Sequence, residues 1–250
     1  MDGSTIDVST IRPIERPEAT TLAATETERM TAALRDLGPD DWARPTANHL
    51  WDVRAMAGHV LGMTETFTGL RRFASDMRAG TKAAGDGPMI DGLTAVQVAA
   101  TADLTTDELL ERLAAAGPAQ ARWRSSRRLM RRIPLKQEMP DGTVETWHLS
   151  DLVDVILTRD TWMHRSDLAA ATGRPMALTA DHDGRIVADV VAEWARRHGE
   201  PFTLRLAGPA GGTFRSGTGG EELALDAIEF CRIVSGRGEG PGLLRQAVPF

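Results

Sequence analysis

Apolar residues recur three or four positions apart along much of the first part of the chain, a period typical of amphipathic helices. Gly38-Pro39 and Gly173-Arg174-Pro175 stand where glycine and proline commonly end a helix. The pattern predicts helices over residues 18–37, 52–78, 94–101, 105–132 and 150–172.

Three segments of this first part interrupt the helical period. Met1 to Pro17 is polar and shows no clear period, so we expect a loose arm. Gly117-Pro118 is a candidate break inside the predicted helix 105–132. Residues 134–146 predict a turn, with Pro140-Asp141-Gly142 at its tip.

The pattern changes after Pro175. A helix predicted over residues 181–198 is followed by short alternating or glycine-bounded runs, which are typical of strands. We expect strands over residues 202–206, 212–216 and 222–225, and a final helix over 226–235. The sequence therefore predicts a bundle of four or five helices over residues 18–175 and a small α+β domain over residues 181–250.

Composition excludes several classes of protein. The single cysteine, Cys231, excludes a disulfide framework and a zinc site built from several thiolates. The formal net charge of −6 argues against nonspecific nucleic-acid binding. No run of 18 apolar residues is present, and the first residues lack the apolar core of a signal peptide. We expect a soluble, cytoplasmic protein whose partners are small molecules.

The predicted helix 150–172 carries the most informative residues. Its apolar face can be followed from Leu149 through Ile156, and at the same spacing this face reaches Asp160 and His164. Burial of a carboxylate and an imidazole is costly unless each finds a partner, and a divalent metal satisfies both. His59 lies at the edge of the inward stripe of helix 52–78 and offers a third ligand.

Simpler interpretations of the same residues stay open at this point. A histidine such as His59 is also typical of a core or boundary position whose hydrogen bonds are satisfied. Asp160 with His164 is also typical of an ion pair on a helix surface. The pattern alone does not decide between these interpretations and a metal site.

Several segments resemble a known family. Residues 51–62, WDVRAMAGHVLG, resemble the W-x-V-R-D-x-x-x-H-L-L-G stretch of DinB-like bundle enzymes. Residues 159–168, RDTWMHRSDL, resemble their R-x-x-E/D-x-x-x-H-R-x-D-L helix. Leu225-Asp226-Ala227, Ser235-Gly236-Arg237 and the ending Val248-Pro249-Phe250 are similar to the second domain of the mycothiol-dependent maleylpyruvate isomerase family.

The resemblance implies a DinB-like bundle, a sterol-carrier-like α/β second domain and a divalent metal, usually zinc. The ligands that it implies are His59, Asp160 and His164. Two positions depart from the family pattern. Ala55 stands where an acid is usual, and Asp160 stands where the best-known isomerase has glutamate, so its carboxylate reaches one methylene less far.

A site with three protein ligands can bind a fourth, and a thiol bound to zinc at that position loses its proton and becomes a strong nucleophile. Cys231 is expected to be a buried structural cysteine, and the resemblance implies an external thiol, mycothiol. We expect a thiol-assisted cis–trans isomerase or a mycothiol S-transferase acting on a small electrophile. A noncatalytic protein that binds an apolar ligand is the alternative from another class.

Two features involve arginine. Arg237, which glycines flank on both sides, is the candidate to bind a substrate carboxylate through its planar fork, and Arg232 is the alternative. The dense cationic stretch between Arg122 and Arg132 is interpreted as a solvated helix face rather than as a binding patch.

Overall fold

A computed structural model describes residues 4–126, 130–138 and 143–250, and the chain divides into two compact units. Residues Arg16–Gln137 and Thr146–Met176 form the bundle unit, and residues Met1–Glu15, Glu138–Glu145 and Ala177–Phe250 form the sheet unit. The helical first part and the small C-terminal sheet confirm the predicted fold class. Over the described residues, every helix is too short or too polar to cross a membrane.

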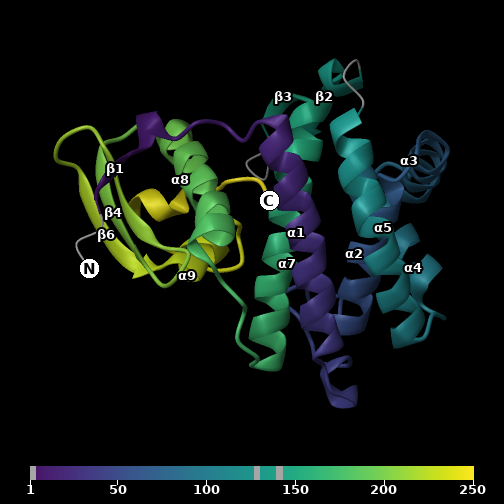
Figure 1. Cartoon of the computed structure of the whole chain (residues 1–250). Helices are drawn as coiled ribbons and strands as arrows, with labels where there is room; N and C mark the ends of the chain where they lie inside the picture. Colours follow the sequence, from purple (N-terminus) through teal and green to yellow (C-terminus); the bar gives the residue numbers. More distant parts are fainter. Residues whose placement is uncertain (1–3, 127–129, 139–142) are drawn as a thin grey trace. The chain divides into compact units, whose positions relative to one another are not determined.

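The bundle unit contains α1 (Arg16–Arg35), α2 (Val53–Thr66), α3 (Leu70–Ala84), α4 (Met89–Thr101), α5 (Thr106–Ser126), α6 (Leu149–Asp151) and α7 (Leu157–Thr172), drawn in Figure 1. The prediction of one helix over residues 52–78 is wrong. Gly69 has an extended backbone, with φ −171° and ψ 158°, and this extended residue separates α2 from α3. α3 also extends beyond the predicted end at residue 78 and continues to Ala84.

The hydrophobic core of the bundle unit surrounds α2. Most α2 residues are buried, including Val53, Ala57 and Leu61, because α2 packs against helices on several sides. Core partners come from α1, α5 and α7: Met30, Leu34, Leu109, Leu113 and Leu168. A side chain near the middle of α2 is therefore enclosed whatever its polarity, and this explains the burial of His59.

α5 begins as the sequence predicts. Thr105 forms a capping box with Glu108, whose Oε2 accepts from Thr105 N at 2.8 Å. The candidate break is absent, since α5 continues through Gly117 and Pro118. A Cβ at Gly117 would lie 2.7 Å from Cγ2 of Thr27, so the glycine permits close packing of α5 on α1. α5 is described as far as Ser126, and a 3-10 turn covers Met130–Arg132, where the sequence predicted the end of the same helix.

The predicted turn over residues 134–146 is wrong in its extent, because most of this segment forms a two-stranded sheet. β2 (Pro134–Glu138) pairs with β3 (Val144–His148). β3 alternates between exposed and partly buried positions, so neither strand carries the apolar signal that would reveal it in the sequence. The expected tip, Pro140-Asp141-Gly142, lies outside the described residues.

A π-helical segment, Leu152–Ile156, joins α6 to α7. A π turn holds more residues than an α turn. The residues that face the core therefore come later in the sequence than they would in an uninterrupted α-helix. Val153 and Leu157 are buried, whereas Ile156 is partly exposed. The face that leads to Asp160 therefore passes through Leu157 rather than through Ile156, which corrects the face read from the sequence.

Two arginines of the cationic stretch hold this π segment. Nε of buried Arg124 donates to the carbonyl oxygen of Val153, and Nη2 of Arg124 donates to Oγ1 of Thr158 at 2.7 Å. Arg131 binds the carboxylate of Asp154 through both of its terminal nitrogens. The interpretation as a solvated face is thus wrong for Arg124 and Arg131. Residues 127–129 of the stretch lie outside the described part of the chain.

The sheet unit contains β1 (Ile6–Asp7), α8 (Arg185–His198), β4 (Phe202–Ala207), β5 (Gly212–Ser216), β6 (Glu221–Asp226) and α9 (Ala227–Val234). The strand order is β1-β5-β4-β6, with β5 antiparallel to β4 and the two outer strands parallel to their neighbours. α8 and α9 lie on one face of this sheet (Figure 1), where Trp194 packs against Phe202 and Phe230. The three predicted strands and two predicted helices of this part are confirmed.

The expectation of a loose N-terminal arm is wrong for residues 6–10 and for Arg16 and Pro17, which begin α1. Ile6 and Asp7 pair with Phe214 and Arg215 as an edge strand of the sheet. A 3-10 turn over Val8–Thr10 follows, and Asp7 caps this turn by accepting from Ser9 N at 3.0 Å. A strand of two residues has no period to detect, and its partner lies about two hundred residues further along the chain.

Candidate metal centre

Three side chains meet inside the bundle unit: His59 from α2, and Asp160 and His164 from α7. Oδ2 of Asp160 lies 3.7 Å from Nε2 of His59, and Oδ1 of Asp160 lies 3.3 Å from Nε2 of His164. One ligand atom of each residue lies within 4.8 Å of those of the other two. The residues singled out in the sequence therefore form one cluster in the structure.

The cluster is enclosed on most sides. The side chains of His59 and His164 retain 4% and 7% of their accessible surface, whereas the Asp160 side chain retains 23%. Asp160 and His164 are four residues apart, so they lie one above the other on α7. The carboxylate marks the side on which the cluster is open to solvent, and this is where a further ligand has access.

Each histidine makes a second contact through its Nδ1 atom. Nδ1 of His59 lies 3.1 Å from Oε1 of Gln97, on α4, and Nδ1 of His164 lies 3.2 Å from Oδ2 of Asp167. Both partners are acceptors, so Nδ1 of each ring carries the hydrogen and Nε2 faces Asp160. Histidines that bind a metal through Nε2 are typically oriented in this way.

The charges of the cluster are strongly coupled. Burial disfavours the imidazolium of His164, but Asp160, with a smaller contribution from Asp167, outweighs burial and raises the pKa of His164 to about 9. Burial would also raise the pKa of Asp160, yet His164 and His59 lower it well below its usual range. Without a metal, a proton on His164 therefore balances the charge of the Asp160 carboxylate.

The donor set fits a divalent ion such as zinc. Two ligand atoms bound to one tetrahedral zinc lie about 3.3–3.5 Å apart, and the contacts of Asp160 with His164 and His59, at 3.3 and 3.7 Å, are close to this value. The 3.7 Å separation is too long for a hydrogen bond. Three protein ligands also leave a position open for water or a substrate, as in catalytic zinc sites.

Trp51 closes one side of the cluster. Its indole stacks on the His59 ring, with centroids 4.9 Å apart and an interplanar angle of 28°, and lies 6.1 Å from the His164 ring. The loop before α2 fixes this position, because Trp51 N donates to Asn48 O and Trp51 O accepts from Thr46. Trp51 thus supplies an apolar wall that restricts water near both imidazoles.

The remaining predicted residues lie in the sheet unit. Cys231 is fully buried in α9 and confirms the expectation of a structural cysteine. Arg237 follows α9 in a closed turn, in which Arg237 N donates to Arg232 O at 2.8 Å and Gly236 has φ 82°. Because the structure describes the two units separately, the functional assignment of Arg237 or Arg232 stays a prediction.

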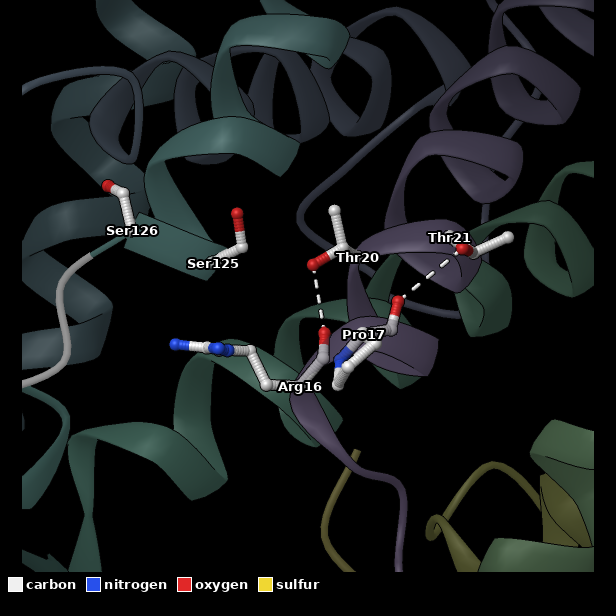
Figure 2. Close-up of a pocket in the computed structure, with 6 residues that line it drawn as sticks. All are labelled: Arg16, Pro17, Thr20, Thr21, Ser125 and Ser126. Atoms are coloured by element: carbon white, nitrogen blue, oxygen red, sulfur yellow. Dashed lines mark hydrogen bonds between the residues drawn. The ribbon is translucent and has the colours of Figure 1, made fainter.

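A second concavity of the bundle unit lies between the start of α1 and the end of α5 (Figure 2). It has a volume of about 520 Å³ and is lined by Arg16, Pro17, Thr20, Thr21, Ser125 and Ser126. Each of the four hydroxyls donates to a carbonyl of its own helix, as the Thr20–Arg16 and Thr21–Pro17 bonds illustrate. The described residues that line this hollow include no imidazole and no carboxylate, so among them the groups for acid–base or metal chemistry are absent.

A family model described as the mycothiol maleylpyruvate isomerase N-terminal domain matches residues 23–169, more than half of the chain. The chain belongs to this family. Two solved structures resemble it over 90% of this chain and 90% of their own: the mycothiol-dependent maleylpyruvate isomerase, with a TM-score of 0.54, and a histidine-to-alanine variant, with 0.53. Each is 18% identical to this chain, so the likeness shows a shared fold. Curated proteins give no match.

Family membership confirms the resemblance drawn from the two motifs, and all three candidate ligands lie within the matched residues. Two partners of the histidines were missed in the sequence. Asp167 lies three residues after His164, so its contact could have been found from helical spacing. Gln97 left no signal, because its contact with His59 depends on how α4 packs on α2.

Proposed function

We propose that this member of the mycothiol maleylpyruvate isomerase family is a metal-dependent enzyme that activates mycothiol for addition to a small electrophile. The supporting observation is the convergence of two imidazole Nε2 atoms and one carboxylate, with each Nδ1 held by an acceptor. His59, Asp160 and His164 would hold the ion. A zinc ion bound there would lower the pKa of a thiol at the open position.

The protein's own residues prepare the site for this chemistry. Asp160 and Asp167 supply two negative charges, which balance those of one divalent ion. Trp51 covers the imidazoles and restricts water, so that electrostatic interactions in the site are strong. The partly exposed side of Asp160 leaves an approach for a thiol and a second substrate.

The proposed reaction is cis–trans isomerisation. The thiolate sulfur adds to one carbon of a conjugated double bond, rotation follows about the resulting single bond, and loss of the same sulfur restores the double bond and the thiol. Atoms balance without a further reactant. Maleylpyruvate is the first substrate to test, because the enzyme whose fold this chain shares is named as a maleylpyruvate isomerase.

Arg237 belongs to the same proposal as the residue that binds a substrate carboxylate, with Arg232 as the alternative. Its planar guanidinium can bind a carboxylate through two parallel hydrogen bonds. A cytoplasmic location is also part of the proposal, because thiols stay reduced in that compartment.

The test measures metal content and product together. Wild-type protein is expected to bind about one equivalent of zinc and to convert maleylpyruvate with catalytic amounts of mycothiol. The double variant His59→Ala/His164→Ala should lose both properties. The control His49→Ala/His148→Ala removes two exposed histidines and should keep both.

The same assay separates the alternatives. Stoichiometric consumption of mycothiol, with a stable thioether product, would identify an S-transferase. Full metal content in the His59→Ala/His164→Ala variant would overturn the ligand assignment. Metal binding without any thiol-dependent conversion of electrophiles would favour a binding protein and overturn the catalytic proposal.

A further inference from the structure

Gln97 packs against α2 at a position between His59 and Thr66 where the helix has no side chain. This position is Gly62. A Cβ there would lie 2.5 Å from Cβ of Gln97, so the glycine is needed for this close packing. Gly58, one turn earlier, similarly accommodates Thr101 of α4. The side chain of Gln97 is 3% exposed and contacts polar atoms on both sides of Gly62.

The contacts form a chain across three helices. Nε of Arg72 donates to Oδ2 of Asp76 at 2.6 Å, and the Thr66 hydroxyl lies 2.8 Å from the same oxygen. Nε2 of Gln97 lies 3.3 Å from Oγ1 of Thr66, and Oε1 of Gln97 lies 3.1 Å from Nδ1 of His59. This series of side-chain contacts thus begins at an ion pair on α3 and ends at His59, a candidate metal ligand.

The number of hydrogens available to Thr66 determines which atom donates in each of these hydrogen bonds. Thr66 has one hydroxyl hydrogen, and its partners Asp76 Oδ2 and Gly62 O, each at 2.8 Å, can only accept. Oγ1 of Thr66 therefore accepts from Gln97, so the amide nitrogen of Gln97 faces Thr66 and its oxygen faces His59. That oxygen accepts a hydrogen from Nδ1, which leaves the lone pair of neutral His59 on Nε2.

We infer that Thr66 and Gln97 are positioning residues which select the metal-binding tautomer of His59. With the opposite amide orientation, Gln97 would donate to Nδ1 and the hydrogen of neutral His59 would move to Nε2, the atom that faces Asp160. The inference rests on the proposed function for its metal-binding consequence, but the tautomer itself is a property of the metal-free protein.

The test uses full-length protein and two readouts. Nitrogen-15 NMR of the histidine rings, recorded on metal-free protein across a range of pH, reports which ring nitrogen of His59 carries the hydrogen. Zinc affinity is measured by competition with a chromophoric chelator. Wild type should show His59 with hydrogen on Nδ1. Gln97→Met should lose this preference and weaken zinc binding by about 10–100-fold, the usual effect of removing such a partner.

Thr66→Val retains the shape of the buried side chain and removes its acceptor, so it should shift the tautomer and weaken zinc binding by about tenfold. Thr66→Ser should behave as wild type. Thr64→Val is the matched control: Thr64 is buried in the same helix but donates to Val60 O outside the chain of contacts, so neither readout should change.

The outcomes separate the two proposals. Hydrogen on Nε2 of wild-type His59 would overturn the inference, as would an unchanged tautomer and zinc affinity in both Gln97→Met and Thr66→Val. A wild-type protein with hydrogen on Nδ1 of His59 but without measurable metal affinity would support the inference and overturn the metal-dependent function.

Discussion

Oδ2 of Asp167 lies 3.2 Å from Nδ1 of His164, one turn further along the same helix, and both side chains are buried. His148 and Asp151 have the same spacing in the sequence, but both are exposed and their corresponding atoms are 3.8 Å apart. The chain therefore contains one buried and one exposed example of the same pairing. Comparison of the two separates the effect of the three-residue spacing in the sequence from the effect of burial.

Asp167→Asn should weaken zinc binding by about tenfold or more, because it removes the negative charge that supports the imidazole while keeping an acceptor of the same shape. Zinc affinity from chelator competition provides the measurement. Asp151→Asn makes the same change in the exposed pair and should leave the affinity unchanged. Equal affinity in wild type and Asp167→Asn would contradict a supporting role for Asp167.

Metal binding near pH 7 should release close to one proton per ion. The pKa of His164 is raised to about 9 in the metal-free protein, so Nε2 of His164 carries a proton at neutral pH that a metal must displace. Affinity should increase as the pH rises toward 9 and then level off, since His164 is already deprotonated above that value. Calorimetry in buffers of different ionisation enthalpy counts the proton. An affinity that is constant between pH 6 and 8 would contradict this account.

The helical period made His59, Asp160 and His164 candidates, and the resemblance of two segments to a known family singled them out as one ligand set. Asp160 and His164 lie four residues apart where apolar residues are expected, and His59 lies at the edge of the inward stripe of its own helix. Polar groups on an inward face need a common partner, which is a local property of the sequence. Helical spacing alone accounts for the proximity of Asp160 and His164, whereas the meeting of His59 with this pair was expected only from the family resemblance.

Features that depend on distant contacts could not be predicted. β1 has only two residues, and its pairing with Phe214 and Arg215 is set by the rest of the sheet. The π segment before α7 shifts the inward face from Ile156 to Leu157, and it depends on Arg124, which comes from another helix. In each case the deciding partner is far away in the sequence.

Arg124→Met should lower the free energy of unfolding by about 1–3 kcal/mol or more, because it leaves the carbonyl of Val153 and the hydroxyl of Thr158 without their buried donor. Burial lowers the pKa of Arg124 to about 10, so the side chain is still charged at neutral pH. Denaturant titration provides the measurement. Arg122→Met, at an exposed position of α5, should change stability by no more than about 0.5 kcal/mol.

The proposed role of Arg237 predicts a loss of activity that is independent of the metal. Arg237 N and Gly236 N donate to Arg232 O and Ile233 O, the two hydrogen bonds of a Schellman motif, so the backbone of this turn does not depend on the Arg237 side chain. Arg237→Lys should therefore fold and bind zinc as wild type does. It keeps the positive charge but loses the planar fork, and we expect kcat/KM for a substrate with a carboxylate to fall by about tenfold or more.

Two further variants make this last test specific. Arg232→Lys should leave turnover unchanged if Arg237 is the carboxylate-binding residue, and the reverse pattern would assign the role to Arg232. Arg245→Lys, at an exposed position of the same unit, controls for the general effect of replacing arginine. A substrate that lacks the carboxylate should be turned over equally by wild type and Arg237→Lys, because the fork then has nothing to bind. Wild-type turnover of the carboxylate substrate by Arg237→Ala would remove the residue from the mechanism.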